Sequence, residues 1–202
     1  MKALFFRFIF LFVLITFISA CSFFEVKVSE PQNPLWQNHK NNVLTIQHWK
    51  TQGRFAAKGD EESWNGHFKW LNDSGEYSIL ISAPLSGGSF QIKGNKQKAI
   101  LILDNDQTYS DTDANSLIHK YTGLKLPINQ LHYWMLGIPS TNQPINLINL
   151  DDQGKLSKLK QDGWEISFKR YTDLDNKSLP NKIFIENHEF DVRLILQNWV
   201  VR

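Results

Sequence analysis

The most regular pattern in the chain is alternation of apolar and polar residues over short segments. Within residues 63–71, Trp64, Phe68 and Trp70 fall on one face, and polar residues fall on the other. A period of two is typical of a strand with one buried face. Turn residues such as Asn-Asp-Ser-Gly separate the segments. The pattern predicts eleven short strands: 51–58, 63–71, 76–82, 89–93, 99–103, 107–110, 145–150, 155–161, 164–170, 183–186 and 190–201.

Three segments show helical spacing instead. Leu35, His39, Val43 and Ile46 recur every three or four residues, which predicts an amphipathic helix that ends before Gly53. Aspartates, a proline and glycines mark the ends of the other two, because these residues favour helix caps and first turns. The three predicted helices are 35–50, from Asp111 or Asp113 to 121, and 127–136.

The order of these elements predicts an α+β fold. Short turns join neighbouring strands, so the sheet should be antiparallel. Helices that are segregated from a run of strands favour a layered arrangement. A sheet of about eleven strands tends to curl. If it curls without closing, the helices can cover its open side.

The first twenty residues have the pattern of a secretory signal. Lys2 and Arg7 precede an apolar run from Phe8 to Ile18, which is short for a permanent transmembrane helix. Ile18-Ser19-Ala20-Cys21 resembles a bacterial lipobox, which implies that Cys21 carries a diacylglyceryl group and an N-acyl chain. The alternative is an ordinary signal with a chance cysteine. We therefore expect a removed signal over 1–20, a lipidated tether over 21–34 and a folded domain over 35–202.

Charge and cysteine content exclude several classes of protein. The 202-residue chain has a formal net charge of +2. Residues 1–20 hold two basic residues and no acidic one, so the remainder has 20 of each and is neutral. A neutral chain without a Lys/Arg block lacks the electrostatic pattern of a nucleic-acid-binding protein. A single cysteine excludes an internal disulfide or a cysteine zinc site.

Motifs for catalysis are missing from the sequence. It has no nucleophile elbow, phosphate-binding loop or dinucleotide fingerprint, and its six histidines lack metal-ligand spacing. The carboxylate pairs Glu61-Glu62, Asp111/Asp113 and Asp151-Asp152 lie where turns and helix caps are expected. The sequence predicts a protein that is not an enzyme and has no cofactor, although a carboxylate hydrolase stays a minor alternative.

Two apolar features stand out. Seven tryptophans are spread over the predicted strands and helices, where they can fill a core or line an apolar cavity. Leu85 follows Pro84 in a turn rich in Pro and Gly, where polar residues are more common. This leucine either folds back onto the core or presents an apolar tip to a membrane or a partner.

The order of these motifs resembles the LolB family of outer-membrane lipoproteins over nearly the whole chain. The turn at 83–87 is about one residue longer than in the family, which puts its geometry in question but keeps its leucine. The resemblance rests on the lipobox at Cys21, Pro34-Leu35-Trp36-Gln37, Thr51-Gln52-Gly53-Arg54-Phe55-Ala56, Phe68-x-Trp70, Pro84-Leu85, Leu117-Ile118-x-Lys120-x-Thr122-Gly123, Pro127-Ile128-Asn129-x-Leu131, Trp134-x-Leu136-Gly137-Ile138-Pro139 and Asn198-Trp199-Val200-Val201.

The resemblance implies a fold: an eleven-stranded antiparallel half-barrel with a lid of three helices over an apolar cavity for acyl chains. It also implies a monomer, anchored through Cys21 at the periplasmic face of the outer membrane, in contact with its lipids. Ser22 agrees, because inner-membrane retention commonly uses Asp there. The expected cavity lining, which depends on strand register, is Phe68, Trp70, Ile79, Ile81, Trp134 and Leu136.

The function implied by the resemblance is the receipt of acylated lipoproteins from the periplasmic carrier LolA and their insertion into the outer membrane without nucleotide. Leu85, with Pro84, is expected to deliver the cargo into the bilayer. Two alternatives stay open. The protein could bind another apolar ligand, such as a glycolipid or a quinone, or it could be a structural envelope lipoprotein with a filled core.

Overall fold

The described residues form an open, curved antiparallel sheet of eleven strands with three helices, as the sequence predicts. The structure is a computed structural model that describes residues 28–59, 62–83, 88–141 and 143–202. Cys21, Pro84 and Leu85 lie outside the described residues. The strands are β1 (His48–Lys58), β2 (Ser63–Asp73), β3 (Glu76–Ala83), β4 (Gly88–Gly94), β5 (Ala99–Leu103), β6 (Thr108–Asp111), β7 (Ile145–Leu150), β8 (Leu156–Gln161), β9 (Trp164–Leu174), β10 (Lys177–Glu186) and β11 (Asp191–Val201).

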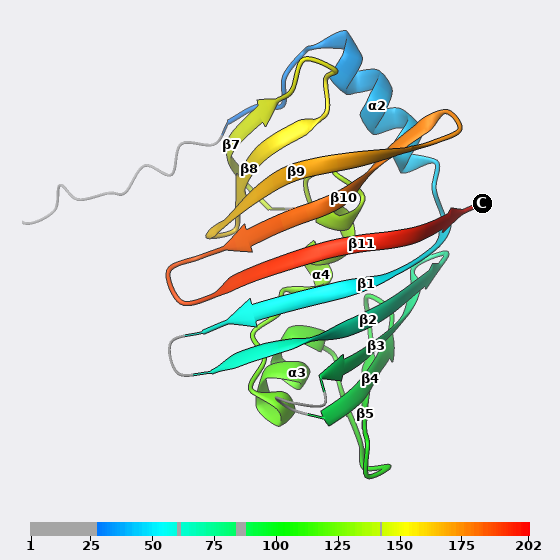
Figure 1. The fold of residues 1–202 in the computed structure, drawn as a ribbon, viewed down its shortest axis with the longest axis vertical. Coiled ribbons are helices and arrows are strands. Elements are labelled where there is room, and N and C mark those ends of the chain that lie inside the picture. The colour runs from blue at the N-terminus through cyan, green and yellow to red at the C-terminus, as the bar shows by residue number, and fades with distance from the viewer. Residues whose placement is uncertain (1–27, 60–61, 84–87, 142) are drawn as a thin grey trace, which may run out of the picture.

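The sheet consists of two runs of consecutive strands that meet at its centre. Strands β1 to β6 form one run and β7 to β11 the other, and β1 pairs with β11 between them (Figure 1). Phe55 of β1 stands opposite Leu194 of β11 on one side and Gly66 of β2 on the other. The first and last strands of the sequence are therefore central strands of the sheet.

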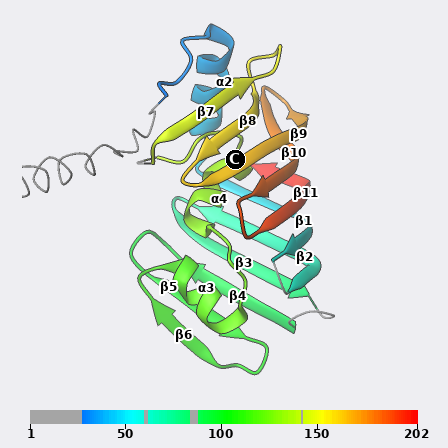
Figure 2. The same ribbon diagram turned by 90° about the vertical axis from the view of Figure 1, so that its left-hand side faces the viewer.

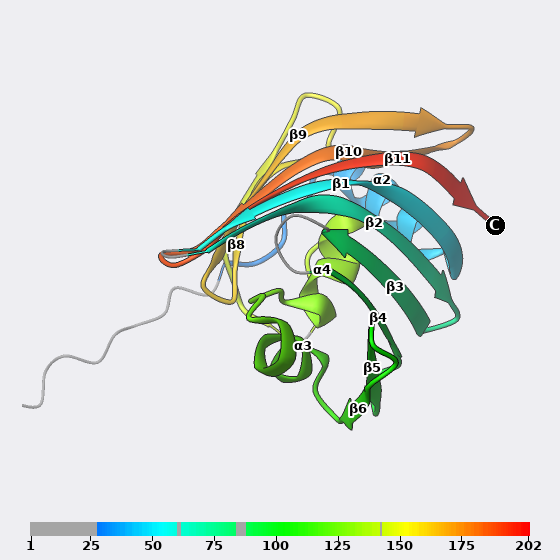
Figure 3. The ribbon, with the colours of Figure 1, turned by 60° about the horizontal axis from the view of Figure 1, so that its bottom comes forward.

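The sheet arches over the helices that follow β6 (Figure 3). Two irregular positions accompany the bend. The register between β1 and β11 shifts between Lys50 and Gln52, close to Asn198 with its left-handed φ of 53°. The register between β9 and β10 shifts beside Pro180, which cannot donate a ladder hydrogen bond. Bulges of this kind bend a strand and increase its local twist.

Helices α3 (Ala114–Thr122) and α4 (Ile128–Met135) lie together on the concave side of the sheet (Figure 2). The side chain of Asp113 caps the N-terminus of α3 by accepting hydrogen bonds from Asn115 and Ser116. Gly123, with φ of 73°, ends that helix in the left-handed conformation that glycine tolerates best. None of the helices among the described residues is long and apolar enough to cross a membrane.

Helix α2 (Pro34–Leu44) packs against β10 near the other end of the sheet. Pro34 occupies its first turn, and the side chain of Asn33 accepts from the Leu35 and Trp36 amides. The indole of Trp36 is fully buried. The prediction that this helix runs to residue 50 is wrong, because it ends at Leu44 and β1 begins at His48.

The end of α2 shows tertiary pairing overriding a helical pattern. Trp49 lies on β1, opposite Asn72 of β2 and Val201 of β11, and is 2% exposed. Strand pairing on both sides satisfies its backbone and buries its indole, and local spacing cannot anticipate partners so far away. The same cause explains the β9–β10 hairpin. β10 begins at Lys177 instead of 183, because it pairs with β9 from Lys177 onward, and Pro180 is accommodated at a register shift.

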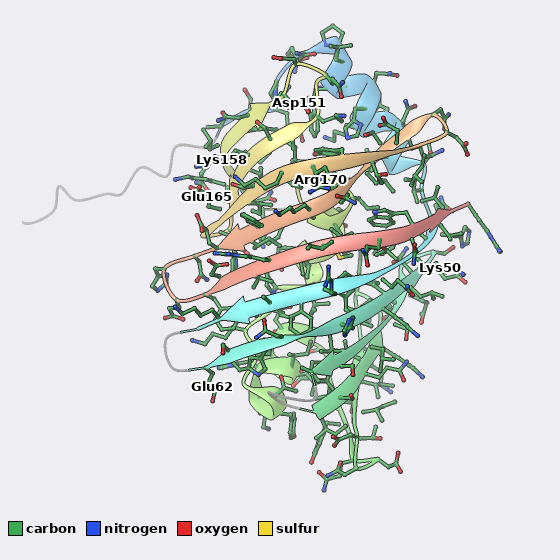
Figure 4. All side chains as sticks on the ribbon, in the orientation of Figure 1. Lys50, Glu62, Asp151, Lys158, Glu165 and Arg170 are labelled. Carbon is green, nitrogen blue, oxygen red and sulfur yellow. The ribbon has the colours of Figure 1, made fainter. Side chains whose placement is uncertain are left out.

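The two faces of the sheet differ in polarity. The inner face joins the helices in one hydrophobic core that includes all the described helices and most strands. The outer face carries charged side chains, among them Lys158 beside Glu165, and Arg170 further along β9 (Figure 4). The described residues therefore share one sheet and one hydrophobic core.

Candidate ligand-binding cavity

An apolar cavity lies between the inner face of the sheet and residues 126–135, which we call the lid. Strands β1, β2, β3 and β11 supply one wall, and α4 with the residues before it supplies the other. All eleven lining residues are hydrophobic. They are Phe55, Phe68, Trp70, Ile79, Ile81, Leu126, Ile128, Leu131, Met135, Val192 and Leu194.

Strand register builds the sheet wall from direct cross-strand pairs. Phe68 faces Ile81, and Trp70 faces Ile79, across β2 and β3. Opposed side chains of this size contact each other and stabilise the pair by roughly 0.2–1 kcal/mol. The inward face predicted for both strands is confirmed, since these four side chains are at most 6% exposed.

Helix α4 builds the opposite wall from one face. Ile128, Leu131 and Met135 stand three and four residues apart, and all are buried. This spacing places them on a single stripe of the helix that faces the sheet. Burying each such side chain stabilises the fold by about 1.5–3 kcal/mol relative to exposure.

The structure brings four of the six predicted lining residues together and separates the other two. Phe68, Trp70, Ile79 and Ile81 line the cavity, whereas Trp134 and Leu136 do not, although both are buried. The reason is the face that each occupies. Trp134 lies off the stripe of α4 that meets the cavity and contacts Gln161 of β8 and Trp164 of β9 instead. Leu136 follows the last residue of the helix. The predicted roles in acyl binding, and those of Cys21, Pro84 and Leu85, stay predictions.

Trp134 joins a buried hydrogen-bonded cluster around Gln161 at the end of β8. Its Nε1–H donates to Gln161 Oε1 over 3.1 Å. The same oxygen accepts from the Ser140 amide at 2.8 Å, and Gln161 Nε2 donates to the carbonyls of Ser140 and Gln143 at 3.0 and 3.2 Å. Gln161 is completely buried and uses both ends of its amide. This cluster ties the C-terminal end of α4, and the segment after it, to the sheet.

Several lining residues were absent from the sequence prediction, although part of the signal was there. Phe55, Val192 and Leu194 lie on the buried phase of alternating strands, and Leu131 and Met135 share the apolar stripe of α4. Alternation identifies their buried face but not the strands that surround the cavity. Nothing in the local sequence marks Gln161 as a buried anchor.

The cavity is small in this structure. Its volume is about 30 Å³, enough for a water molecule or two. Pockets that hold small ligands typically measure about 300–1,000 Å³. An extended apolar ligand therefore fits between these walls only if they move apart.

A larger groove, the polar groove, adjoins the cavity and shares Trp70 and Ile128 with it. Its volume is about 330 Å³. Residues of β2 and β3, the turn between β4 and β5, α4 and the segment after α4 line it. They are Trp70, Asn72, Gly75, Tyr77, Asn95, Lys96, Ile128, Asn129, Gln130, His132, Tyr133, Ser140, Thr141 and Gln143.

Burial shifts the pKa of two groups in this groove. It lowers the pKa of His132 to about 4, and the positive charge of Lys96 acts in the same direction. It raises the pKa of Tyr77 to about 12, with a further contribution from the charge of Asp113. Burial disfavours the charged form of each group. At neutral pH the groove therefore presents a neutral imidazole and a neutral phenol.

Within the described part of the chain, four groove residues have a buried polar atom without a hydrogen-bond partner. These are Trp70 Nε1, Tyr77 Oη, Gln130 Oε1 and Ser140 Oγ. A neighbouring indole, Trp49, has the same property, and its ring lies 5.7 Å from Trp70 and 5.6 Å from His132. Buried polar atoms in folded proteins are nearly always paired, so this concentration is unusual. The described residues include no group of three or more acidic, His or Cys side chains placed to hold a metal ion.

These features define a class of structure, a half-barrel with a helical lid and an internal apolar cavity. Two solved structures share the fold. One is a DUF1329 family protein from Desulfovibrio piger, with a TM-score of 0.51, 9% identity and coverage of 83% of this chain and 90% of that chain. The other is a putative outer membrane lipoprotein-sorting protein domain from Vibrio parahaemolyticus, with a TM-score of 0.51, 13% identity and coverage of 83% and 91%.

Sequence comparison assigns the family. The profile of the family described as outer membrane lipoprotein LolB matches residues 47–199. The outer-membrane lipoprotein LolB of Nitrosococcus oceani is 33% identical over 171 residues, which cover 85% of each chain. That of Pseudomonas syringae pv. syringae is 27% identical over 202 residues, 98% of each. The chain belongs to the LolB family of outer-membrane lipoproteins.

Proposed function

We propose that this protein is an outer-membrane receptor that takes acylated lipoproteins from the carrier LolA into its apolar cavity and inserts them into the membrane. The observation that carries the proposal is the cavity between β1, β2, β3, β11 and α4, with eleven hydrophobic lining residues. Membership of the LolB family supports the outer-membrane location. Lipidation of Cys21 supplies the anchor.

The physical need for such a cavity follows from the cargo. Each methylene group of an acyl chain contributes about 0.8 kcal/mol when it is removed from water. Exposing several chains during transfer would cost tens of kcal/mol, so the chains must pass directly between apolar sites. The sequence has no nucleotide-binding motif, and transfer therefore runs downhill. We expect the acyl chains to bind more tightly to this protein than to the carrier, and more tightly still to the bilayer. Each tenfold difference in affinity corresponds to about 1.4 kcal/mol.

Opening of the lid precedes binding, because the closed cavity holds about 30 Å³. The C-terminal end of α4 is tied to β8 through Trp134 and Gln161. At its N-terminal end, Pro127 provides no side-chain cap, and the polar contacts are the exposed pairs Asn129–Asp113 at 3.4 Å and Gln130–Asp162 at 2.6 Å. Exposed hydrogen bonds exchange readily with water. We therefore expect the helix to pivot about Trp134 and to lift at Ile128.

A transfer assay tests the proposal. Residues 22–202, which contain every described element, are mixed with LolA loaded with an acylated lipoprotein, and the cargo on each protein is measured. Cargo that moves to this protein and rarely returns supports the proposal. Cargo that stays on LolA while this protein is folded contradicts it. Competition by a glycolipid or a quinone would then identify another apolar ligand.

The delivery step has its own variant. Leu85→Glu should leave acyl binding intact and impair transfer of cargo to vesicles, because a charged tip enters the bilayer poorly. Leu80→Glu is the matched control, since Leu80 lies on β3 and is 39% exposed. If Leu85→Glu weakens acyl binding and delivery equally, the role of this loop in delivery is wrong.

A further inference from the structure

The polar groove differs from the apolar cavity in what its residues offer a ligand. Trp70 is 3% exposed, and its indole N–H has no partner within the described residues. The Tyr77 hydroxyl is buried without a partner in the same groove. A buried donor without a partner is unfavourable, because it has lost its hydrogen bonds to water. A ligand with acceptor atoms would remove that cost.

The charge of the groove narrows the ligand class. Of the described residues that line it, Lys96 is the one with a formal charge at neutral pH, and it is exposed. The other groups are amides, hydroxyls, an indole and a neutral imidazole. A phosphate or carboxylate would meet one exposed ammonium group, whereas a neutral ester or amide meets several neutral donors. Ester carbonyl oxygens accept hydrogen bonds and donate none.

The position of the groove identifies the part of the ligand that it holds. Trp70 and Ile128 form the boundary between groove and cavity. Ile128 is the first residue of α4, at the end we expect to lift, so opening would join the two spaces. An amphipathic molecule that bridges them places its hydrocarbon against Phe68 and Leu131 and its first polar atoms beside Tyr77. The groove volume of about 330 Å³ suits a compact polar group.

We propose that the polar groove binds the glyceryl ester group at the base of the cargo's acyl chains, with Trp70 Nε1 and Tyr77 Oη donating hydrogen bonds to the ester carbonyl oxygens. This inference rests on the proposed function and adds a second, polar subsite to it. His132, in ring contact with Trp49 and Tyr133, holds the aromatic side of the groove in place. The groove then distinguishes a diacylglyceryl group from a simple hydrocarbon of equal length.

The test compares two ligands that differ in two carbonyl groups. A dipalmitoyl-glyceryl-cysteine peptide and its dialkyl ether counterpart have chains of the same length, and each displaces the apolar dye ANS from residues 22–202. We expect the wild-type protein to bind the ester roughly 3–30-fold more tightly than the ether, which corresponds to one or two hydrogen bonds. This ratio requires no substitution and is independent of folding defects.

Two variants locate the effect. Tyr77→Phe removes the hydroxyl and should weaken the ester roughly 3–10-fold while leaving the ether unchanged. Tyr109→Phe is the matched control, because Tyr109 lies on β6 and donates to Gln107 outside the groove. Equal affinities of the wild-type protein for ester and ether, or equal weakening of both by Tyr77→Phe, would overturn the subsite. If neither lipopeptide displaces the dye, the proposed function fails as well.

Discussion

The two sides of Trp70 differ in how their buried atoms are satisfied. On the cavity side, neighbours such as Phe68 and Leu131 offer only hydrocarbon, and burial is favourable without further conditions. On the groove side, Tyr77 and Ser140 bury polar atoms that have no partner within the described residues. Burying a polar group is unfavourable unless it is hydrogen-bonded. The contrast separates an apolar wall that needs no further partner from a polar wall whose buried atoms would gain hydrogen bonds from a ligand.

The largest expected effect is on the cavity side. Leu194→Ala should lower the free energy of unfolding by about 2–5 kcal/mol, because it enlarges a cavity in a packed wall where Leu194 is 5% exposed. Leu80→Ala, on the outer face, should change it by less than about 0.5 kcal/mol. Urea titrations of both variants provide the measurement. A loss below about 1 kcal/mol for Leu194→Ala would show that this wall is loosely packed and would remove the contrast.

A smaller effect on the groove side depends on pH. The pKa of His132 is about 4 in the folded protein and about 6.5 in an unfolded chain. Between these values the unfolded chain binds a proton that the folded protein does not. The contribution of the neutral imidazole to stability is therefore fully present above pH 6.5 and is lost as pH decreases from 6.5 to 4. The loss approaches about 3 kcal/mol at pH 4.

His132→Gln should remove most of this loss, and His67→Gln, at an exposed outer position, should not. Denaturant titrations at pH 7 and pH 4.5 separate this histidine from the carboxylates that titrate in the same range. An unchanged difference between the two pH values in His132→Gln would show that the imidazole is hydrated and that the groove is wetter than the structure indicates.

The smallest effect compares two tyrosines. Tyr171 donates its hydroxyl hydrogen to the Leu156 carbonyl at 2.8 Å, so Tyr171→Phe should lower the free energy of unfolding by about 1 kcal/mol. Tyr77→Phe removes a hydroxyl without a partner and should leave stability unchanged within about 0.5 kcal/mol, or raise it slightly. Thermal unfolding of both variants decides. A cost for Tyr77→Phe equal to that of Tyr171→Phe would mean that its hydroxyl is satisfied.

Much of the fold and part of the cavity lining could be predicted from the sequence, because the patterns that predict them are local. Alternation within a strand shows which residues share a face, so Phe68, Trp70, Ile79 and Ile81 could be assigned together before their partners were known. The helix cap at Asp113 is equally local.

The remaining features depend on partners that are distant in sequence. Trp134 finds Gln161 on a strand formed 27 residues later, and Thr51 donates to the Gln197 carbonyl across 146 positions. No local pattern encodes such pairs. The unpartnered atoms of the groove are harder still, because they are defined by contacts that the fold does not make.

The pairing of β1 with β11 has a consequence for how the chain must fold. β1 is synthesised early and has β2 as its next neighbour in the chain, but its other edge has no partner until Asp191–Val201 is synthesised. Contacts that join residues about 140 positions apart form slowly. A truncation of the last twelve residues would remove a central strand and leave two separate ribbons, β1 to β6 and β7 to β10. The apolar interior is therefore completed only after the last strand has been synthesised, and a chain that lacks β11 has no enclosed cavity.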